Sequence, residues 1–297
     1  MKILVTGANG LLGQKLCERI ILDNSMTLIA TARNKLTYPL NHHTFQILDI
    51  CSKDQVDNVV SSTKPDVIIN TAAMTNVDQC ENEKEACWEA NVLAVANLVE
   101  ASKKIDCHFI HLSTDFIFNG KEGPLDELAS PGPVNYYGRS KLAAEELIRN
   151  SLKNWSIVRT VLVFGITDDM SRSNIVLWVK KSLEEKRSIR VVNDQWRTPT
   201  LAEDLAEGCY LVAKKKAFGV YHISGRDFLS PYDIAIQTAD FFNLDKSLIS
   251  ATNSNTFKQD AERPLKTGFI IDKAKKDLGY RPHSFKEGLA MIASQLS

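Results

Sequence analysis

The sequence has neither the net positive charge nor the long apolar segment that would bind it to a nucleic acid or a membrane. Its 36 basic and 36 acidic side chains cancel, so no excess of positive charge is available for either surface. No apolar run approaches the roughly 18 residues of a membrane-spanning helix, and the chain runs from Met1 straight into a strand pattern with no signal segment. We therefore expect a cytoplasmic protein without nucleic-acid or membrane partners.

Metal-binding spacings are absent as well. The six cysteines form no C-x-x-C pair, the six histidines form no H-E-x-x-H motif, and the acidic residues are scattered. Most cysteines lie in apolar segments, which is typical of buried free thiols in a reducing compartment. We predict neither a structural nor a catalytic metal.

What the chain does have is a regular alternation of strand and helix patterns in its first half. The predicted strands are 2–6, 27–32, 44–48, 66–70, 108–112 and 156–164, and the predicted helices are 12–22, 53–62, 84–103 and 136–150. Strands such as 67–69 are apolar throughout, as expected for a parallel sheet covered on both faces. The fold class is therefore α/β, with a doubly wound parallel sheet of the Rossmann type.

The pattern changes after about residue 165. Helices are predicted at 173–185, 202–214, 231–242, 271–278 and 285–295, with short strands at 189–192 and 220–223. With 297 residues, the chain has room for about two domains. We predict a dinucleotide-binding domain of residues 1–165, rejoined by about 193–215. Residues 166–192 and 216–297 would form a smaller mixed α/β substrate-binding lobe, with the ligand cleft between the two.

The strongest local signal is a glycine-spaced turn directly after the first strand. Gly7 permits a tight turn, Gly10 allows backbone to approach a pyrophosphate, and Gly13 lets the next helix pack close to the strand. The free N–H groups of that helix suit a phosphate. We assign the whole turn to cofactor binding, namely Gly7, Asn9, Gly10, Leu11, Leu12 and Gly13.

The end of the second strand indicates which cofactor binds. NAD-binding folds usually place an acidic residue there for the ribose 2′-OH, whereas this strand ends at Arg33, which suits a 2′-phosphate. We favour NADPH, with NADH as the alternative and a solvated surface charge as the non-functional interpretation of Arg33. Asp49 and Ile50 follow the third strand and are predicted to lie near the adenine, although Asp49 also suits a helix N-terminus.

Tyr137 and Lys141 are four residues apart on a predicted helix, so they share one face. A nearby ammonium stabilises a phenolate and lowers the tyrosine pKa, which lets the pair transfer a proton to or from a carbonyl oxygen. Thr114 follows the strand 108–112, at the sheet edge where ligands of such folds bind. Taken alone, a Tyr-x-x-x-Lys pair on a surface helix is more often without function. The non-functional interpretation of Ser113 and Thr114 is that they cap a turn.

With these motifs in this order, the chain resembles the extended short-chain dehydrogenases/reductases, and among them the dTDP-4-dehydrorhamnose reductase family. The resemblance covers residues 1 to about 290. It rests on the glycine turn and on the segments 70–81 (N-x-A-A-x-T-x-V-D-x-x-E), 113–120 (STDFIFNG), 194–200 (D-Q-x-x-x-P-T) and 263–272, together with Asn91. It implies reduction of a nucleotide sugar.

The resemblance also implies roles for individual residues. Tyr137 would donate the proton, Lys141 would tune the tyrosine and hold the ribose, and Thr114 would orient the carbonyl. Ala72, Ala73 and Asn91 would join the cofactor site. The implied substrate-binding residues are Thr75, Val77, Asp78, Thr114, Asp115, Phe116, Gln195, Arg197 and Arg263.

Three departures leave the particular sugar open. Phe116 replaces a tyrosine common in the reductases, Arg197 and Thr198 replace Gly-Ser, and the segment 263–272 differs from the short form of the family. We expect Arg197 to grip a nucleotide diphosphate, or else to form a surface salt bridge. Related dehydratases have Asp-Glu after the threonine, so Asp115-Phe116 argues against that reaction.

The resemblance implies NADPH-dependent reduction of dTDP-4-dehydro-L-rhamnose, with a homodimer as one option. One alternative is a reductase or epimerase of another nucleotide sugar. The second is a non-catalytic NADP-binding regulatory subunit, similar to the β-subunit of methionine adenosyltransferase.

Overall fold

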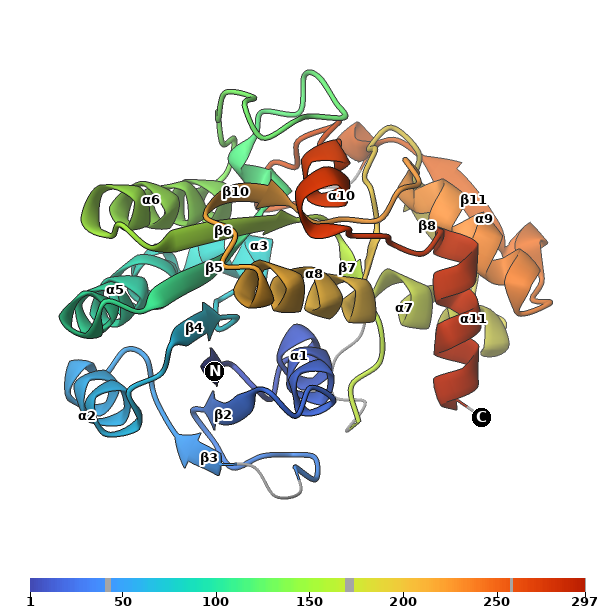
Figure 1. The fold of residues 1–297 in the computed structure, drawn as a ribbon. Helices are drawn as coiled ribbons and strands as arrows, with labels where there is room; N and C mark the ends of the chain where they lie inside the picture. The colour runs from blue at the N-terminus through green and yellow to red at the C-terminus, as the bar shows by residue number, and fades with distance from the viewer. Residues whose placement is uncertain (41–43, 169–173, 257–258, 297) are drawn as a thin grey trace.

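The computed structural model describes residues 1–40, 44–168, 174–256 and 259–296. Its centre is a seven-stranded sheet in the order β10-β6-β5-β4-β1-β2-β3, with every neighbouring pair parallel (Figure 1). The strands are β1 (Lys2–Thr6), β2 (Thr27–Ala32), β3 (Thr44–Ile47), β4 (Val67–Asn70), β5 (His108–Thr114), β6 (Trp155–Thr160) and β10 (Gly219–His222). The predicted doubly wound parallel sheet is confirmed.

Helices cover both faces of this sheet because its strands are apolar on both sides. In β1, Ile3 and Val5 belong to one core, while Leu4 between them belongs to the core of the opposite face. The first core is closed by α1 (Leu11–Ile21) and α8 (Ala202–Lys214), and the second by α2 (Lys53–Thr63), α5 (Ala94–Ile105) and α6 (Tyr136–Ser151). Figure 1 shows these two helix layers on either side of the sheet.

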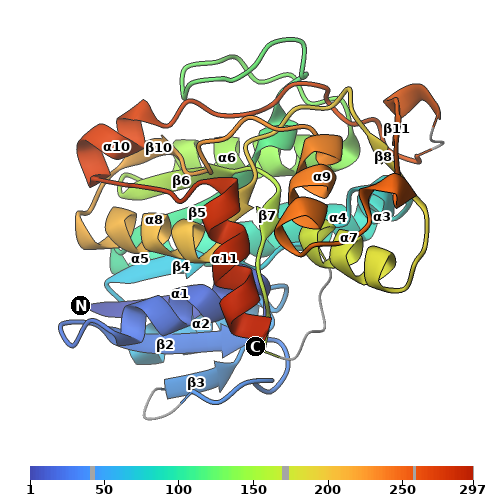
Figure 2. The ribbon, with the colours of Figure 1, turned by 90° about the vertical axis from the view of Figure 1, so that its right-hand side faces the viewer.

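A smaller group of elements lies beyond the carboxyl ends of the strands. Here β8 (Ile189–Val192) pairs in parallel with β11 (Ile249–Thr252), and α7 (Ile175–Glu184) packs against α9 (Pro231–Phe241). The last helix, α11 (Phe285–Leu296), contacts α9, as Figure 2 shows. The helix α9 begins where it does because Ser230 and Asp233 form a reciprocal capping box around Pro231.

One part of the predicted substrate-binding lobe belongs to the main sheet instead. The lobe was predicted to include residues 216–297, but β10 pairs with β6 at the edge of the seven-stranded sheet. In addition, α10 (Asp272–Leu278) packs on α8 and β10. The reason is topological: α8 already covers the sheet, so a short apolar strand after it completes a parallel crossover. The other domain limits stay a prediction.

Two elements predicted as continuous are divided. The helix predicted at 84–103 consists of α4 (Lys84–Trp88), the π-helical turn η1 (Glu89–Leu93) and α5. The strand predicted at 156–164 breaks at Leu162, whose φ is +38°, and continues as β7 (Val163–Phe164). Periodicity cannot show either break, because both arise from tertiary contacts.

Several short elements were not predicted from the sequence. They are α3 (Val77–Asn82), β9 (Thr200–Leu201, paired with β7), β11 and the 3-10 turns η2 (Asp115–Ile117), η3 (Lys246–Leu248) and η4 (Ser254–Thr256). The predicted first residue of the helix 173–185, Ser173, lies outside the described residues.

The structure shows the state of the cysteines and allows a search for metal-binding groups and membrane-spanning helices. All six are free thiols and five of them are buried, Cys51 being the exposed one. Among the described residues, no group of three or more histidine, cysteine or acidic side chains is placed to hold a metal ion. No helix in the described ranges is both long enough and apolar enough to cross a bilayer.

Candidate active site

A cleft of about 1010 Å³ opens at the carboxyl ends of the parallel strands, where ligands of open α/β sheets bind. Most of the predicted site residues line it: Gly7, Asn9, Gly10, Leu11, Leu12, Gly13, Arg33, Asp49, Ile50, Ala72, Ala73, Thr75, Val77, Thr114, Asp115, Phe116, Tyr137 and Lys141. The others, which do not line it, are Asp78, Asn91, Gln195, Arg197 and Arg263. The fold therefore brings together segments that the sequence keeps more than a hundred residues apart.

The glycine turn is shaped by close backbone contacts. Gly7 has a φ of +71°, and its carbonyl accepts a hydrogen bond of 2.9 Å from the Gly10 N–H. A Cβ at Gly13 would lie 2.2 Å from the same carbonyl, so only glycine allows α1 to start so near β1. Gly10 caps α1 with no side-chain hydrogen bond. The N-terminus of α1 therefore faces the cleft and is suited to hold a phosphate.

Arg33 and Asp49 lie at the far end of this half of the cleft. Arg33 follows β2, and it is exposed rather than buried in an internal contact. The Asp49 side chain accepts a 3.0 Å hydrogen bond from the Cys51 N–H, so it stabilises the turn into α2 while also lining the cleft. Arg33 and Lys141 are the cationic side chains among the described residues of the cleft wall.

The helix α6 places Tyr137 and Lys141 in the cleft. It begins at Tyr136 because the Asn135 side chain accepts a 2.8 Å hydrogen bond from the Gly138 N–H. A Cβ at Gly138 would lie 2.1 Å from the Phe116 carbonyl, so this glycine allows α6 to press against the chain after β5. As a result, Tyr137 meets the Phe116 ring edge-on, with 5.8 Å between ring centroids.

The electrostatics differ from the expectation for this pair. Burial raises the pKa of Tyr137, and the largest opposing effect comes from a hydrogen bond to Thr114, not from Lys141. Burial also lowers the pKa of Lys141 to about 8, with Glu145 acting in the opposite direction. The prediction that the Lys141 ammonium lowers the pKa of Tyr137 is therefore wrong, because the loss of hydration on burial raises that pKa by more. Tyr137 is a protonated phenol near neutral pH, the form that a proton donor needs.

Asn91, predicted to touch the cofactor, instead fixes the chain beside it. Its side-chain oxygen accepts from the Met74 N–H at 2.9 Å, and its amide nitrogen donates to the Met74 carbonyl at 3.0 Å and to the Ser140 hydroxyl at 3.1 Å. Asn91 lies in the π-helical turn, which its contacts with Met74 and α6 explain.

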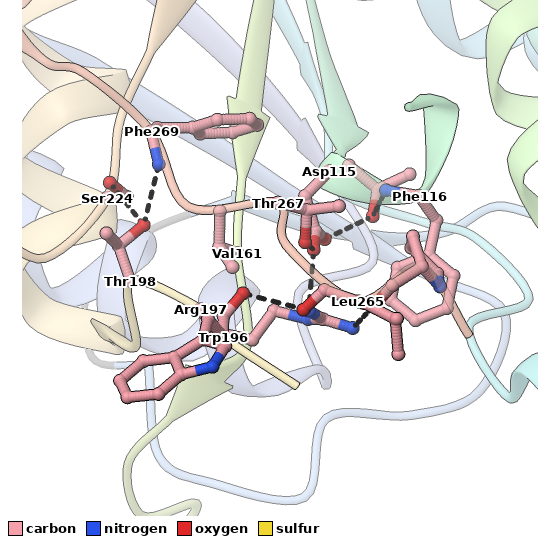
Figure 3. A network of polar contacts seen from close by, with 12 residues as sticks. Asp115, Phe116, Val161, Trp196, Arg197, Thr198, Ser224, Leu265, Thr267 and Phe269 are labelled. Atoms are coloured by element: carbon pink, nitrogen blue, oxygen red, sulfur yellow. Dashed lines mark hydrogen bonds and ion pairs between the residues drawn. The ribbon is translucent and has the colours of Figure 1, made fainter. Parts of the chain in front are cut away.

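Arg197, predicted to grip a diphosphate, is committed inside the protein (Figure 3). It is 4% exposed and donates to the carbonyls of Pro264 (2.6 Å), Trp196 (2.9 Å) and Leu265 (3.1 Å). Its Nε lies 3.4 Å from a carboxylate oxygen of Asp115. It is therefore neither a surface salt bridge nor a free guanidinium, and the prediction is corrected on both counts.

The carboxylate of Asp115 is equally occupied. It accepts hydrogen bonds from the hydroxyls of Thr267 and Thr114, the latter at 3.1 Å. Burial raises its pKa, and the Arg197 guanidinium opposes that shift. Asp115, predicted to bind the substrate, therefore orients Thr114 from behind.

Asp78 and Arg263 are paired with each other rather than directed into the cleft. The guanidinium makes two contacts with the carboxylate, at 2.5 and 2.7 Å, and this pairing lowers the pKa of Asp78. The pair ties the segment before Pro264 to the start of α3. Gln195 is buried outside the cleft wall.

Two of the cleft residues that were absent from the predicted site have unpartnered hydroxyls. The hydroxyls of Ser113 and Thr167 are buried, line the cleft and have no hydrogen-bond partner within the described part of the chain. Such hydroxyls are suited to bind a polar ligand. The motif around Ser113 pointed to that residue, whereas nothing local in the sequence marks Thr167.

The parallel sheet, the glycine turn and the buried tyrosine–lysine pair together define a nucleotide-dependent oxidoreductase. Comparison with known proteins narrows this class to one family. The chain belongs to the RmlD substrate binding domain family, which matches residues 1–297. It is thereby placed among sugar-nucleotide oxidoreductases.

Two curated relatives illustrate the range of the family. A dTDP-4-dehydrorhamnose reductase of Aggregatibacter actinomycetemcomitans is 31% identical over 303 residues, covering 98% of each chain. Methionine adenosyltransferase 2 subunit beta of Xenopus laevis is 29% identical over 251 residues, covering 83% of this chain and 73% of that protein.

Two solved structures share the fold over nearly the whole length. The Clostridium acetobutylicum dTDP-4-dehydrorhamnose reductase has a TM-score of 0.89 at 28% identity, covering 100% of this chain and 99% of the other. The Bacillus anthracis reductase, solved in complex with NADP, has a TM-score of 0.85 at 27% identity, covering 99% of each chain.

Proposed function

We propose that the protein reduces the 4-keto group of a 4-keto-6-deoxy nucleotide sugar with NADPH, and that this sugar nucleotide is dTDP-4-dehydro-L-rhamnose. The observation that carries the proposal is that Thr114, Tyr137 and Lys141 line one cleft together with the glycine turn. The reductases among the relatives support the choice of substrate, and the NADP complex of one of them supports the choice of cofactor.

The cofactor half of the cleft fits NADPH in shape and charge. The closely packed glycine turn leaves no side chain where a pyrophosphate would approach the N-terminus of α1. Ala72 and Ala73 line the cleft just after β4, and their small side chains leave room for the cofactor to pass over the end of that strand. Arg33 would hold the 2′-phosphate. When bound, NADPH supplies a hydride to the sugar carbonyl carbon.

The proton comes from the protein. Thr114 now donates its only hydroxyl hydrogen to Asp115, and with substrate bound that hydrogen would turn to the carbonyl oxygen and orient it. As the oxygen gains negative charge, the phenol of Tyr137 donates its proton and becomes a phenolate. Lys141, one helical turn away, would stabilise that phenolate and hold the ribose.

Measuring NADPH oxidation by absorbance with freshly prepared dTDP-4-dehydro-L-rhamnose tests this proposal, with NADH in parallel. We expect rapid turnover with NADPH preferred, and a smaller preference in the Arg33→Ser variant. Tight NADPH binding without turnover of this sugar would reject the rhamnose assignment and leave the cofactor assignment in place.

Two alternatives have specific support. Phe116 and the internal role of Arg197 change the substrate half relative to the family pattern, so another nucleotide sugar is the first alternative, tested with a panel of keto sugars. The likeness to methionine adenosyltransferase 2 subunit beta supports the second, a regulatory subunit. Capture of an enzyme partner by a protein that binds NADPH but reduces no keto sugar would favour it.

We also propose the cytoplasm as the compartment, because free thiols are the rule there. A homodimer is proposed for the assembly. Fractionation and light scattering, respectively, test these two assignments.

A further inference from the structure

A row of buried polar side chains crosses the sheet beneath the cleft. Thr6, Asn70 and His111 are in register on the adjacent strands β1, β4 and β5. The Thr6 hydroxyl donates to the Asn70 side-chain oxygen at 2.6 Å, and the Asn70 amide nitrogen lies 3.1 Å from Nδ1 of His111. All three side chains are at most 1% exposed. Polar groups are rarely buried so deeply in a parallel sheet without a specific role.

The row ends at Lys141. The Nε2 of His111 lies 3.0 Å from Nζ of Lys141, which is 2% exposed. The other titratable groups that act on Lys141 are Glu145 on its own helix and the thiols of Cys80 and Cys87 on α3 and α4. The imidazole is therefore the direct polar partner of this lysine on the sheet side, within the described structure.

The hydrogen-bond directions couple the imidazole to the charge on the lysine. Because the Asn70 amide nitrogen faces Nδ1, the hydrogen of a neutral imidazole is on Nε2, where it needs an acceptor. A neutral Lys141 amine is that acceptor. A charged Lys141 must instead donate to Nε2, which moves the imidazole hydrogen to Nδ1 and requires the Asn70 amide to turn over. Thr6 then changes from donor to acceptor.

We propose that His111, held by Asn70 and Thr6, is a positioning residue for the reaction: it fixes the direction of the Lys141 amino group and adapts to its charge. This inference rests on the proposed function, because Lys141 is assigned there to Tyr137 and the ribose. Because Lys141 also lines the cleft, a single hydrogen bond to His111 leaves the other valences of Nζ available to a ligand there. Burial and the nearby Lys141 keep the imidazole itself neutral by lowering the pKa of His111 well below its usual value.

Two substitutions separate the two contacts of the imidazole. His111→Gln keeps a polar atom near the Nε2 position and therefore the bond to Lys141. His111→Asn keeps one near Nδ1 and retains only the bond to Asn70. We expect His111→Asn to lower kcat about ten- to hundredfold, as for loss of a buried hydrogen bond to a charged group, and to shift the pH profile of kcat/KM. His111→Gln should recover most of both.

His108 provides a matched control. It is a buried histidine three residues upstream on the same strand, and its Nε2 contacts the Ser156 hydroxyl at 2.7 Å, away from the cleft. His108→Asn should lower stability without moving the pH profile. Equal pH profiles for wild type, His111→Asn and His108→Asn would overturn the proposal, since a purely structural role predicts that result.

A second measurement needs no substrate and so remains decisive if the proposed reaction is wrong. In protein labelled with ¹⁵N-histidine, the His111 ring nitrogens should change their shifts as Lys141 titrates near pH 8, and Lys141→Met should abolish that change. Ring shifts that stay constant between pH 6 and 10 in the wild type would refute the coupling. Failure of turnover with the coupling intact would reject the proposed function alone.

Discussion

The two halves of the cleft are built in different ways. The phosphate end of the cofactor half is made from one continuous segment, the glycine turn, in which the Gly7 carbonyl contacts both Gly10 and Gly13. The substrate half is held by ion pairs between distant segments, Asp115 with Arg197 and Asp78 with Arg263. Such a turn places the first N–H groups of α1, from Leu11 onward, at the cleft. In the substrate half, by contrast, the charged side chains that the sequence motifs assign to the substrate are already paired with one another inside the protein.

This difference changes the expected recognition of the substrate. Two arginines predicted to bind the substrate, Arg197 and Arg263, are instead bound to carboxylates and carbonyls of the protein. The hydroxyls of Ser113 and Thr167 are the buried side-chain polar groups without a partner within the described cleft wall. Recognition in the substrate half should therefore rely on hydroxyl and backbone groups more than on charge.

Arg197→Met should destabilise the protein by about 3–5 kcal/mol, because it leaves the Asp115 carboxylate buried without its cation. The loss should shrink as the pH falls, since the raised pKa of Asp115 allows it to become neutral. Urea unfolding as a function of pH measures this. The double variant Asp115→Asn/Arg197→Met should recover part of the loss, and a loss below about 1 kcal/mol would show that Arg197 is dispensable to the fold.

Tyr137→Phe tests the point where the two halves meet. It removes the proton donor but keeps the ring that packs on Phe116, so turnover should fall at least about 10²-fold. NADPH affinity, measured by fluorescence titration, should change little. Unchanged turnover would remove Tyr137 from the mechanism.

Gly13→Ala should perturb the cofactor half through its packing. The added Cβ would meet the Gly7 carbonyl at 2.2 Å, which should cost about 1–3 kcal/mol of stability and weaken NADPH binding. Gly10→Ala is the matched control, because its Cβ would lie 3.2 Å from the same atom. That variant should lose NADPH affinity with little loss of stability. Equal stability losses in the two variants would contradict this account of the turn.

Acid should weaken the edge of the main sheet, because His222 of β10 packs against Phe269, with 3.8 Å between ring centroids. Burial lowers the pKa of His222 to about 3, and that of His108 to about 4. Stability should be highest above pH 6.5 and should fall as the pH drops toward these values, by up to about 1.4 kcal/mol per pH unit for each imidazole. The His222→Phe variant should show a shallower acid slope in thermal or urea unfolding.

Asp78→Asn should have the smallest effect. The carboxylate is 39% exposed, so losing its pairing with Arg263 should lower stability by less than about 1 kcal/mol. Differential scanning calorimetry of this variant beside Arg197→Met compares an accessible ion pair with a buried one. A loss as large as that of Arg197→Met would mean that accessibility does not separate the two pairs.

Much of the main sheet was predictable because its signals are local. The limits of β1, β2 and α8 agree with the predicted ranges, since apolar periodicity and caps act within a few residues. The edge strand β10 was predicted as a strand but assigned to the wrong lobe. The break in the helix at η1 was missed, because it depends on Asn91 bonding to Met74, seventeen residues earlier in the chain.

By itself, the sequence determined the class of the fold, the glycine turn and the face shared by Tyr137 and Lys141, because each depends on neighbours within a few residues. Only the tertiary structure decided which charges remain available. It buried Arg197 against Asp115, paired Arg263 with Asp78 and placed His111 behind Lys141. Partner choice and desolvation depend on distances between segments, and no local pattern in the chain encodes them.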